Sequence, residues 1–220
     1  MKSRRTLLKT AALAAASAVL AGVMPSALAA PPAGDKFRRL PSPVATGSDG
    51  IEVLEFFWYG CPHCNEFEPL LAEWEKSRGK TIVLRRVPVA FREDFVVHQK
   101  LFYALEALGK LPDMHAKVFK AMHVDRERLM SVEAITAFIE KNGIDKKAFT
   151  DAFNSFGVAS KSAQAAQLAR AYQIDGVPTL AIDGMFTTSA NIAGGSHADA
   201  LAVADQLIAQ RREARKGQKR

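Results

Sequence analysis

The chain has 220 residues, with 30 basic and 23 acidic side chains and only two cysteines. Residues 1–29 hold four of the basic side chains and residues 211–220 hold six, so the part between them is close to neutral and has no basic stripe typical of a nucleic-acid-binding groove. The roughly 190 residues after the first thirty can form a stable core without disulfides, so the cysteines are not needed as structural cross-links.

Residues 1–29 are similar to an export signal. Basic side chains precede an uncharged, alanine-rich run over 10–24, and Ala27 and Ala29 form an A-x-A cleavage pattern. The run is too short to span a membrane comfortably, and no later stretch is long and apolar enough. We therefore predict a cleaved signal peptide. The adjacent arginines also resemble a twin-arginine signal, and the choice between the two export routes stays open.

The first predicted elements are a buried strand over 51–58 and a helix that begins at Cys61, with Pro62 in its first turn. A second strand over 81–87 completes a strand–helix–strand unit, which is typical of a parallel sheet. The helix is expected to bend at Pro69 and to bury Phe67, Leu70, Leu71 and Trp74. Both cysteines then lie at the carboxyl end of a buried strand.

Only helices are predicted from about residue 95 to residue 173, including one between Ser131 as N-cap and Gly143 as stop signal. Strand pattern returns over 178–182 and 185–187, joined by a tight turn at Asp183-Gly184. A last helix begins after Ser196. We predict an α/β chain with these parts: 36–93 and 174–210 as one domain, 94–173 as an inserted helical domain, and 211–220 as a solvated, frayed basic tail.

The two cysteines form the motif Cys61-Pro62-His63-Cys64. Disulfide exchange needs an attacking thiolate and a second thiol close enough to resolve the mixed disulfide, and a two-residue gap at a helix start supplies both. Cys61 is the predicted nucleophile, because free N–H groups and the helix dipole stabilise its negative charge, and His63 is expected to add to this. A stabilised thiolate makes the disulfide a stronger oxidant.

Two non-catalytic interpretations of the cysteine pair are weaker. The spacing also fits half of a zinc site, but the remaining histidines do not supply a second pair of ligands with suitable spacing: His98, His115, His123 and His197. A static structural disulfide would close so short a loop that it would constrain the unfolded chain little. We therefore expect no metal at the cysteines and no cofactor.

Three segments together resemble the DsbA family of periplasmic oxidants: the strand 53–57, the motif 61–64, and Gly176-Val177-Pro178. The resemblance implies a thioredoxin fold with an inserted all-helical domain, a periplasmic location, reduced exported polypeptides as substrates, and reoxidation by a DsbB-like membrane partner linked to quinone. It also implies that Pro178 is cis beside the cysteines, and that the backbone of Val177 pairs with the substrate.

Glu55 lies inside the first apolar strand, where a carboxylate should have a raised pKa and could move protons during thiol exchange. The resemblance also implies a buried acid at this place. Glu68, seven residues after Cys61, is expected to be an ordinary solvated glutamate.

Two alternative functions stay open at this point. A disulfide isomerase or reductase would use the same motif, although no segment is left over for a dimerisation domain, and we expect a monomer. A metal chaperone could bind soft ions through Cys61 and Cys64, but it would lack the methionine- and histidine-rich motif such proteins use.

Overall fold

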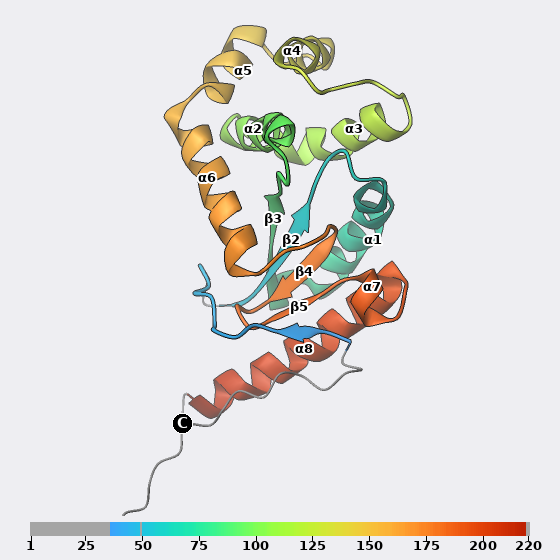
Figure 1. Cartoon of the computed structure of the whole chain (residues 1–220), viewed down its shortest axis with the longest axis vertical. Helices are drawn as coiled ribbons and strands as arrows, with labels where there is room; N and C mark the ends of the chain where they lie inside the picture. Colours follow the sequence, from blue (N-terminus) through green and yellow to red (C-terminus); the bar gives the residue numbers. More distant parts are fainter. Residues whose placement is uncertain (1–35, 49, 219–220) are drawn as a thin grey trace, which may run out of the picture.

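The computed structural model describes residues 36–48 and 50–218, so the predicted signal peptide lies outside the described residues. One five-stranded sheet, in the order β1-β5-β4-β2-β3, lies at the centre with helices around it (Figure 1). The strands are β1 (Arg38–Arg39), β2 (Ile51–Phe57), β3 (Ile82–Pro88), β4 (Thr179–Ile182) and β5 (Phe186–Thr188). The helices are α1 (Pro62–Arg78), α2 (Val96–Ala107), α3 (Leu111–His123), α4 (Val132–Lys141), α5 (Lys146–Phe153), α6 (Phe156–Ala171), α7 (Ala190–Ala193) and α8 (His197–Gln218), with short 3₁₀ turns at Gly79–Thr81 and Glu93–Phe95.

Strand β2 is the central element of the sheet. All seven of its residues are buried, because it pairs with β3 in parallel on one side and with β4 in antiparallel on the other. Its almost uninterrupted apolar run suits a strand that is covered on both faces. The predicted strand–helix–strand unit is therefore present, with α1 connecting β2 to its parallel neighbour β3.

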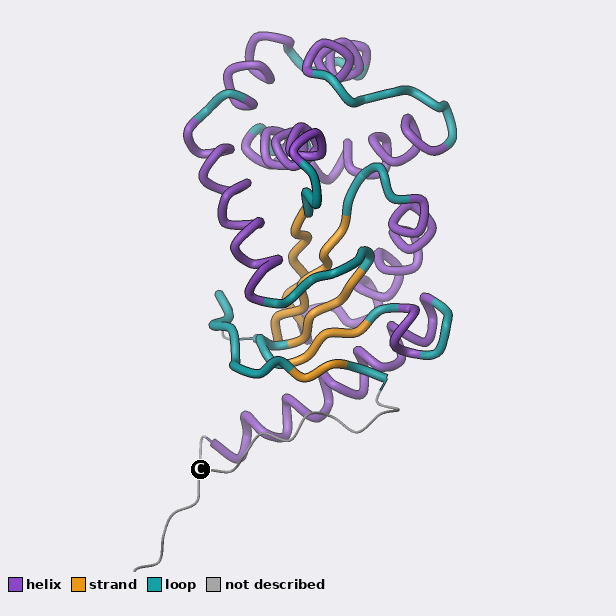
Figure 2. Tube along the Cα trace, viewed as in Figure 1, coloured by secondary structure: helices purple, strands orange, loops and turns teal. Residues whose placement is uncertain are grey.

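The sheet separates two hydrophobic cores. Val53 belongs to the core on the side of α1 and α8, together with Phe67 and Leu207. Leu54, its neighbour in β2, belongs to the core on the side of the middle helices, together with Leu101. The alternation follows from the two-residue period of a strand. Figure 2 shows the helices surrounding the strands in this way.

The five helices α2 to α6 all lie between β3 and β4, in the stretch for which the sequence predicts a helical insertion (Figure 1). Three of them begin at residues whose side chains accept a backbone N–H of the first turn: Ser131, Asp145 and Ser155. Gly143 follows α4 with a φ of 78°, which confirms Ser131 and Gly143 as the ends of that helix.

The turn between β4 and β5 also follows the prediction. Asp183 and Gly184 both have positive φ, 53° and 68°, and the N–H of Met185 donates to the carbonyl oxygen of Ile182 at 3.0 Å, which closes a tight turn. A Cβ at position 184 would lie 2.0 Å from the carbonyl oxygen of Val44, so this position requires glycine.

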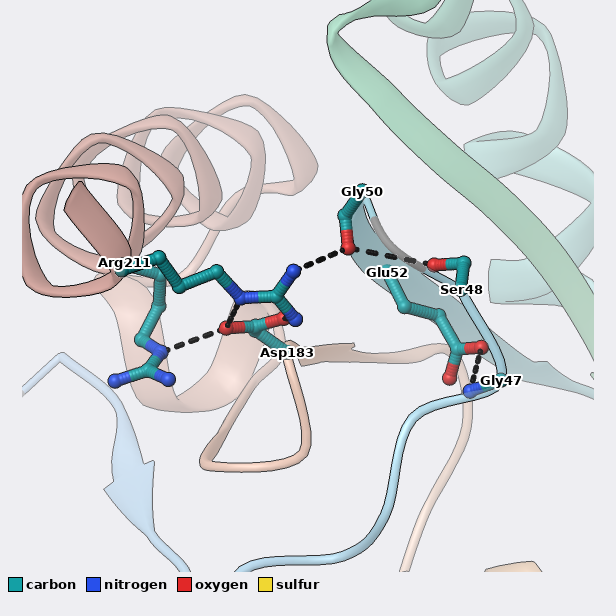
Figure 3. A network of polar contacts seen from close by, with 7 residues as sticks. Gly47, Ser48, Gly50, Glu52, Asp183 and Arg211 are labelled. Carbon is teal, nitrogen blue, oxygen red and sulfur yellow. Dashed lines mark hydrogen bonds and ion pairs between the residues drawn. The ribbon is translucent and has the colours of Figure 1, made fainter. Parts of the chain in front are cut away.

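The predicted frayed tail is wrong for residues 211–218, the part of the tail that the structure describes. Helix α8 continues to Gln218, and the side chains of Arg211 and Arg215 bind the buried carboxylate of Asp183. Figure 3 shows the contact between Arg211 and Asp183. Nε of Arg211 donates to Oδ2 of Asp183 at 2.8 Å, and Nη1 of Arg215 donates to the carbonyl oxygen of Gly50 at 2.9 Å. A buried carboxylate needs such partners, and they hold the end of α8 against the sheet.

Two smaller expectations also need correction. Leu70 is 42% exposed, because it lies on the side of α1 that faces neither core, whereas Phe67, Leu71 and Trp74 are buried as predicted. The sequence analysis also missed β1 and α7, which have two and four residues and are too short to show a periodic pattern.

Candidate active site

Cys61 is the residue immediately before α1, and Pro62 is the first residue of the helix. The loop after β2 brings Cys61 there, and the backbone N–H groups of Cys64 and Asn65 both point to its carbonyl oxygen, at 3.1 and 3.2 Å. Both cysteines are free thiols. Cys61 is 9% exposed and Cys64 is completely buried, so only Cys61 can meet another protein at the surface.

The two thiols differ strongly in acidity. A hydrogen bond from the Cys64 thiol lowers the pKa of Cys61 to about 6 against the opposing effect of burial, and the backbone N–H groups of Cys64 and His63 and the charge of His63 lower it further. Burial raises the pKa of the Cys64 thiol far above its ordinary value, and Cys61 beside it adds to this effect. In the reduced protein the negative charge is therefore on Cys61.

The loop that enters β4 lies beside Cys61. The peptide bond between Val177 and Pro178 is cis, and the thiol of Cys61 is 3.5 Å from the carbonyl oxygen of Val177. This contact follows from the sheet, since β4 runs antiparallel to β2 and Thr179 pairs with Phe56 near the carboxyl end of β2. The structure thus brings together the motif and the Val177-Pro178 segment, which are more than a hundred residues apart in the chain.

A groove of about 540 Å³ opens next to this loop. Val177, Pro178, His63 and His197 are among the residues that line it.

Glu55 is buried completely at the centre of β2, as predicted. Neither of its carboxylate oxygens has a hydrogen-bond partner among the described residues, and Nε of Arg86 lies 3.3 Å from Oε2. Burial raises the pKa of Glu55 to about 8, with a further increase from the carboxylate of Glu68 and an opposing effect of Arg86. Glu55 can therefore hold or release a proton near neutral pH.

The expectation that Glu68 is solvated is wrong. Its side chain is 12% exposed and binds Nη2 of Arg86 at 2.7 Å, while Nε2 of His115 lies 3.3 Å from its second oxygen. Although burial acts in the opposite direction, His115 and Arg86 hold the pKa of Glu68 below its ordinary value. Arg86 also lies 3.6 Å from Glu75, so one guanidinium faces three carboxylates beneath the active-site helix.

Histidines of the middle helices hold the loop between β2 and Cys61. His98 of α2 accepts a hydrogen bond from the indole N–H of Trp58 at 2.8 Å. His123 of α3 donates to the carbonyl oxygen of Tyr59 at 2.7 Å, and His115 shares a 2.8 Å hydrogen bond with the Tyr59 hydroxyl. These three imidazoles therefore pack against the loop, and the sequence analysis did not connect them with the site.

His63 lies at the surface of α1, where its Nδ1 is 3.1 Å from Glu66. Its charge lowers the pKa of Cys61, but by less than the hydrogen bond from the Cys64 thiol does. His197, the first residue of α8, lies next to it across the groove, with the two ring centres 6.4 Å apart. Only the folded chain brings His197 here, because 134 positions separate it from His63.

Comparison with known proteins gives matches over most of the chain. A family model described as a DSBA-like thioredoxin domain matches residues 52–204. A protein of Burkholderia cepacia named thiol:disulfide interchange protein DsbA is 45% identical over 170 residues, which cover 76% of this chain and 80% of that protein. A protein with the same name from Pseudomonas syringae pv. tomato is 38% identical over 218 residues, covering 98% of this chain and 100% of that protein.

Solved structures agree with these matches. The crystal structure of Pseudomonas aeruginosa DsbA has a TM-score of 0.79 to this structure at 37% identity, and the match covers 83% of this chain and 95% of that chain. Among the described residues, no helix combines the length and the apolar character needed to cross a membrane.

Proposed function

Because the chain belongs to the DSBA-like thioredoxin domain family, we propose that it is a thiol:disulfide oxidoreductase that donates the disulfide of Cys61 and Cys64 to other proteins. The family match and the solved relatives confirm the predicted thioredoxin fold with inserted helices. The names of the relatives do not favour the two alternative functions, a disulfide isomerase or reductase and a metal chaperone.

The reaction follows from the different positions of the two cysteines. A thiolate of the substrate attacks the Cys61 sulfur of the oxidised protein, which breaks the Cys61–Cys64 bond and leaves the electron pair on Cys64, where it takes up a proton. A second substrate thiolate then attacks the substrate sulfur of this mixed disulfide and expels Cys61 as a thiolate. The substrate gains a disulfide, and two electrons remain on the protein.

Three observations support these roles. Cys61 is at the start of a helix, where unpaired N–H groups stabilise the thiolate that leaves in the second step. Cys64 is buried behind it, out of reach of the substrate. The Cys61 thiol lies 3.5 Å from the carbonyl oxygen of Val177, so a polypeptide bound to the backbone of the Val177-Pro178 loop would have its sulfur next to Cys61. This last contact is the observation that carries the proposal.

Glu55 is the proposed proton carrier for the buried thiol. Its charge acts on Cys64, whose pKa it raises, and its own pKa of about 8 allows it to exist in either form near neutral pH. His63 and Pro62 are proposed to tune Cys61, Pro62 by starting the helix without an N–H that would need a partner.

The oxidised form has to be regenerated by an acceptor of two electrons. We propose a DsbB-like membrane protein linked to quinone in this role, and reduced exported polypeptides as substrates, in the periplasm. The support is the predicted export signal together with the relatives named DsbA.

Trapping of reaction intermediates tests the proposal. In Cys64→Ser the Cys61 thiolate should attack disulfides of exported polypeptides and stay bound to them as mixed disulfides, because no Cys64 thiol is left to release it, and Cys61→Ser should accumulate none. A diagonal gel of the exported proteins shows both outcomes. Mixed disulfides on Cys61→Ser instead would reverse the assigned roles. A reduction potential as low as that of a reductant such as thioredoxin, about −270 mV, would contradict the direction of transfer.

A further inference from the structure

Two histidines and one carboxylate gather on the surface beside the cysteines. His63 and Glu66 are three residues apart on α1, and His197 is the first residue of α8. Oε2 of Glu66 is 3.1 Å from Nδ1 of His63 and 3.9 Å from Nε2 of His197. One nitrogen or oxygen atom of each residue lies within 4.8 Å of those of the other two.

These distances fit a metal centre with little movement. A tetrahedral zinc ion with bonds of about 2.0 Å keeps its ligand atoms about 3.3 Å apart. The two distances to Glu66 are close to that value. The side chains of His63 and Glu66 are 74% and 60% exposed, so both can turn and bring the three ligand atoms closer together.

His197 supplies a fixed ligand. Its ring stacks on Phe67 with a centre distance of 5.0 Å and an interplanar angle of 30°, and its side chain is only 17% exposed. Ser196 caps the helix that carries it by accepting the N–H of Asp199. Nε2 of His197 therefore faces Glu66 without any rearrangement of α1 or α8.

We propose that His63, Glu66 and His197 together bind one divalent transition-metal ion of the Zn²⁺ type. Two imidazole nitrogens and one carboxylate oxygen form a donor set that zinc uses in proteins, and they leave a fourth position for water or another ligand. All three residues line the same groove as Val177 and Pro178, so the bound ion would lie in that groove. The cysteines take no part in this site.

A simple i,i+3 ion pair between His63 and Glu66, with His197 as a chance neighbour, is the competing explanation. Zinc binding separates the two explanations, and the oxidised protein is used because its sulfurs are in the disulfide and cannot bind zinc as thiolates. Isothermal titration of the untagged oxidised chain with zinc ions alone should show one ion bound per chain.

Substitution of single ligands gives the decisive comparison. His197→Gln and Glu66→Gln should each weaken zinc binding by at least about tenfold, since even loss of an outer-shell partner typically costs that much. Glu73→Gln, which changes another exposed carboxylate of α1, is the matched control and should bind zinc like the unaltered chain. Circular dichroism of each variant shows whether it is folded.

Two outcomes would overturn the site. One is that the oxidised chain does not bind zinc, and the other is that His197→Gln and Glu66→Gln bind it as tightly as the control. X-ray absorption at the zinc edge gives a second readout: nitrogen and oxygen neighbours are expected, and sulfur neighbours would contradict the assignment. Neither measurement depends on thiol exchange, so failure here leaves the proposed function untouched.

Discussion

Replacement of Glu55 by glutamine should make the protein more stable at high pH. Its carboxylate is fully buried without a hydrogen-bond partner among the described residues, and the guanidinium of Arg86 lies 3.3 Å away. Arg86 keeps Glu68 and Glu75 as partners in the variant. The charged form of Glu55 is therefore a cost to the folded state, and Glu55→Gln removes it.

The size of the effect depends on pH. The pKa of Glu55 is 4.5 in the unfolded chain and about 8 in the folded protein, so the folded protein binds the proton more tightly and loses stability as pH rises between these values. Each pH unit within this range corresponds to about 1.4 kcal/mol, which gives an upper bound of about 5 kcal/mol above pH 8. An amide without partners costs about 1–2 kcal/mol at every pH, so the net gain above pH 8 is at most about 3–4 kcal/mol.

Urea unfolding of the oxidised protein, followed by tryptophan fluorescence, measures this difference. The free energy of unfolding of Glu55→Gln relative to the unaltered chain should rise steadily from about pH 4.5 to about pH 8. Glu73→Gln, on the surface of α1, should show no such trend. A difference that stays constant over this range would refute the reasoning, because a buried ionised carboxylate cannot give a pH-independent effect.

The remaining predictions concern Cys61, Glu68 and Asp183. The thiolate absorbance of the reduced protein should titrate near pH 6, and a midpoint near the ordinary value of 9 would contradict the site. Because that pKa is lowered, the thiolate stabilises the reduced folded protein fully above pH 9, and urea unfolding should show this stabilisation disappearing as pH falls through 6. Glu68→Gln should lower stability at neutral pH by about 3 kcal/mol, as it leaves His115 and Arg86 without their shared carboxylate, and an unchanged urea midpoint would argue against that pairing. Asp183→Asn should lower the free energy of unfolding by a similar amount, because it frees the end of α8. The control Glu213→Gln, which removes an exposed ion pair, should change the free energy of unfolding little.

The sequence predicts the elements that depend on local patterns. The apolar run of β2, the proline after Cys61 and the Asp183-Gly184 turn each follow from a few neighbouring residues, and the structure has them in place. The motif and the Val177-Pro178 segment also led to the correct family, because both are short and specific.

The polar partners could not be predicted in the same way. Arg86, Glu68 and His115 come from β3, α1 and α3, and no local spacing connects them. Glu68 taken alone has the pattern of a surface residue, since its burial depends on elements that follow it in the chain.

The prediction of a solvated basic tail was wrong for the same reason. Arg211 and Arg215 of α8 bind the carboxylate of Asp183, which lies 28 and 32 positions earlier in the chain. The sequence predicts Asp183 only as a turn residue and does not indicate that its charge needs a partner. Charges near a chain end are usually solvated, and only the fold reveals the buried partner.

The contacts of His98, His115 and His123 with the loop before Cys61 have a consequence for engineering. These side chains come from α2 and α3, so a shortened protein without residues 94–173 would lose all three of these contacts with Trp58 and Tyr59. A chimera that takes its helices from another protein would have to supply matching acceptors and donors at the same places. The helical segment is thus part of the frame that holds the nucleophile in position, and it is not a cover that can be exchanged freely.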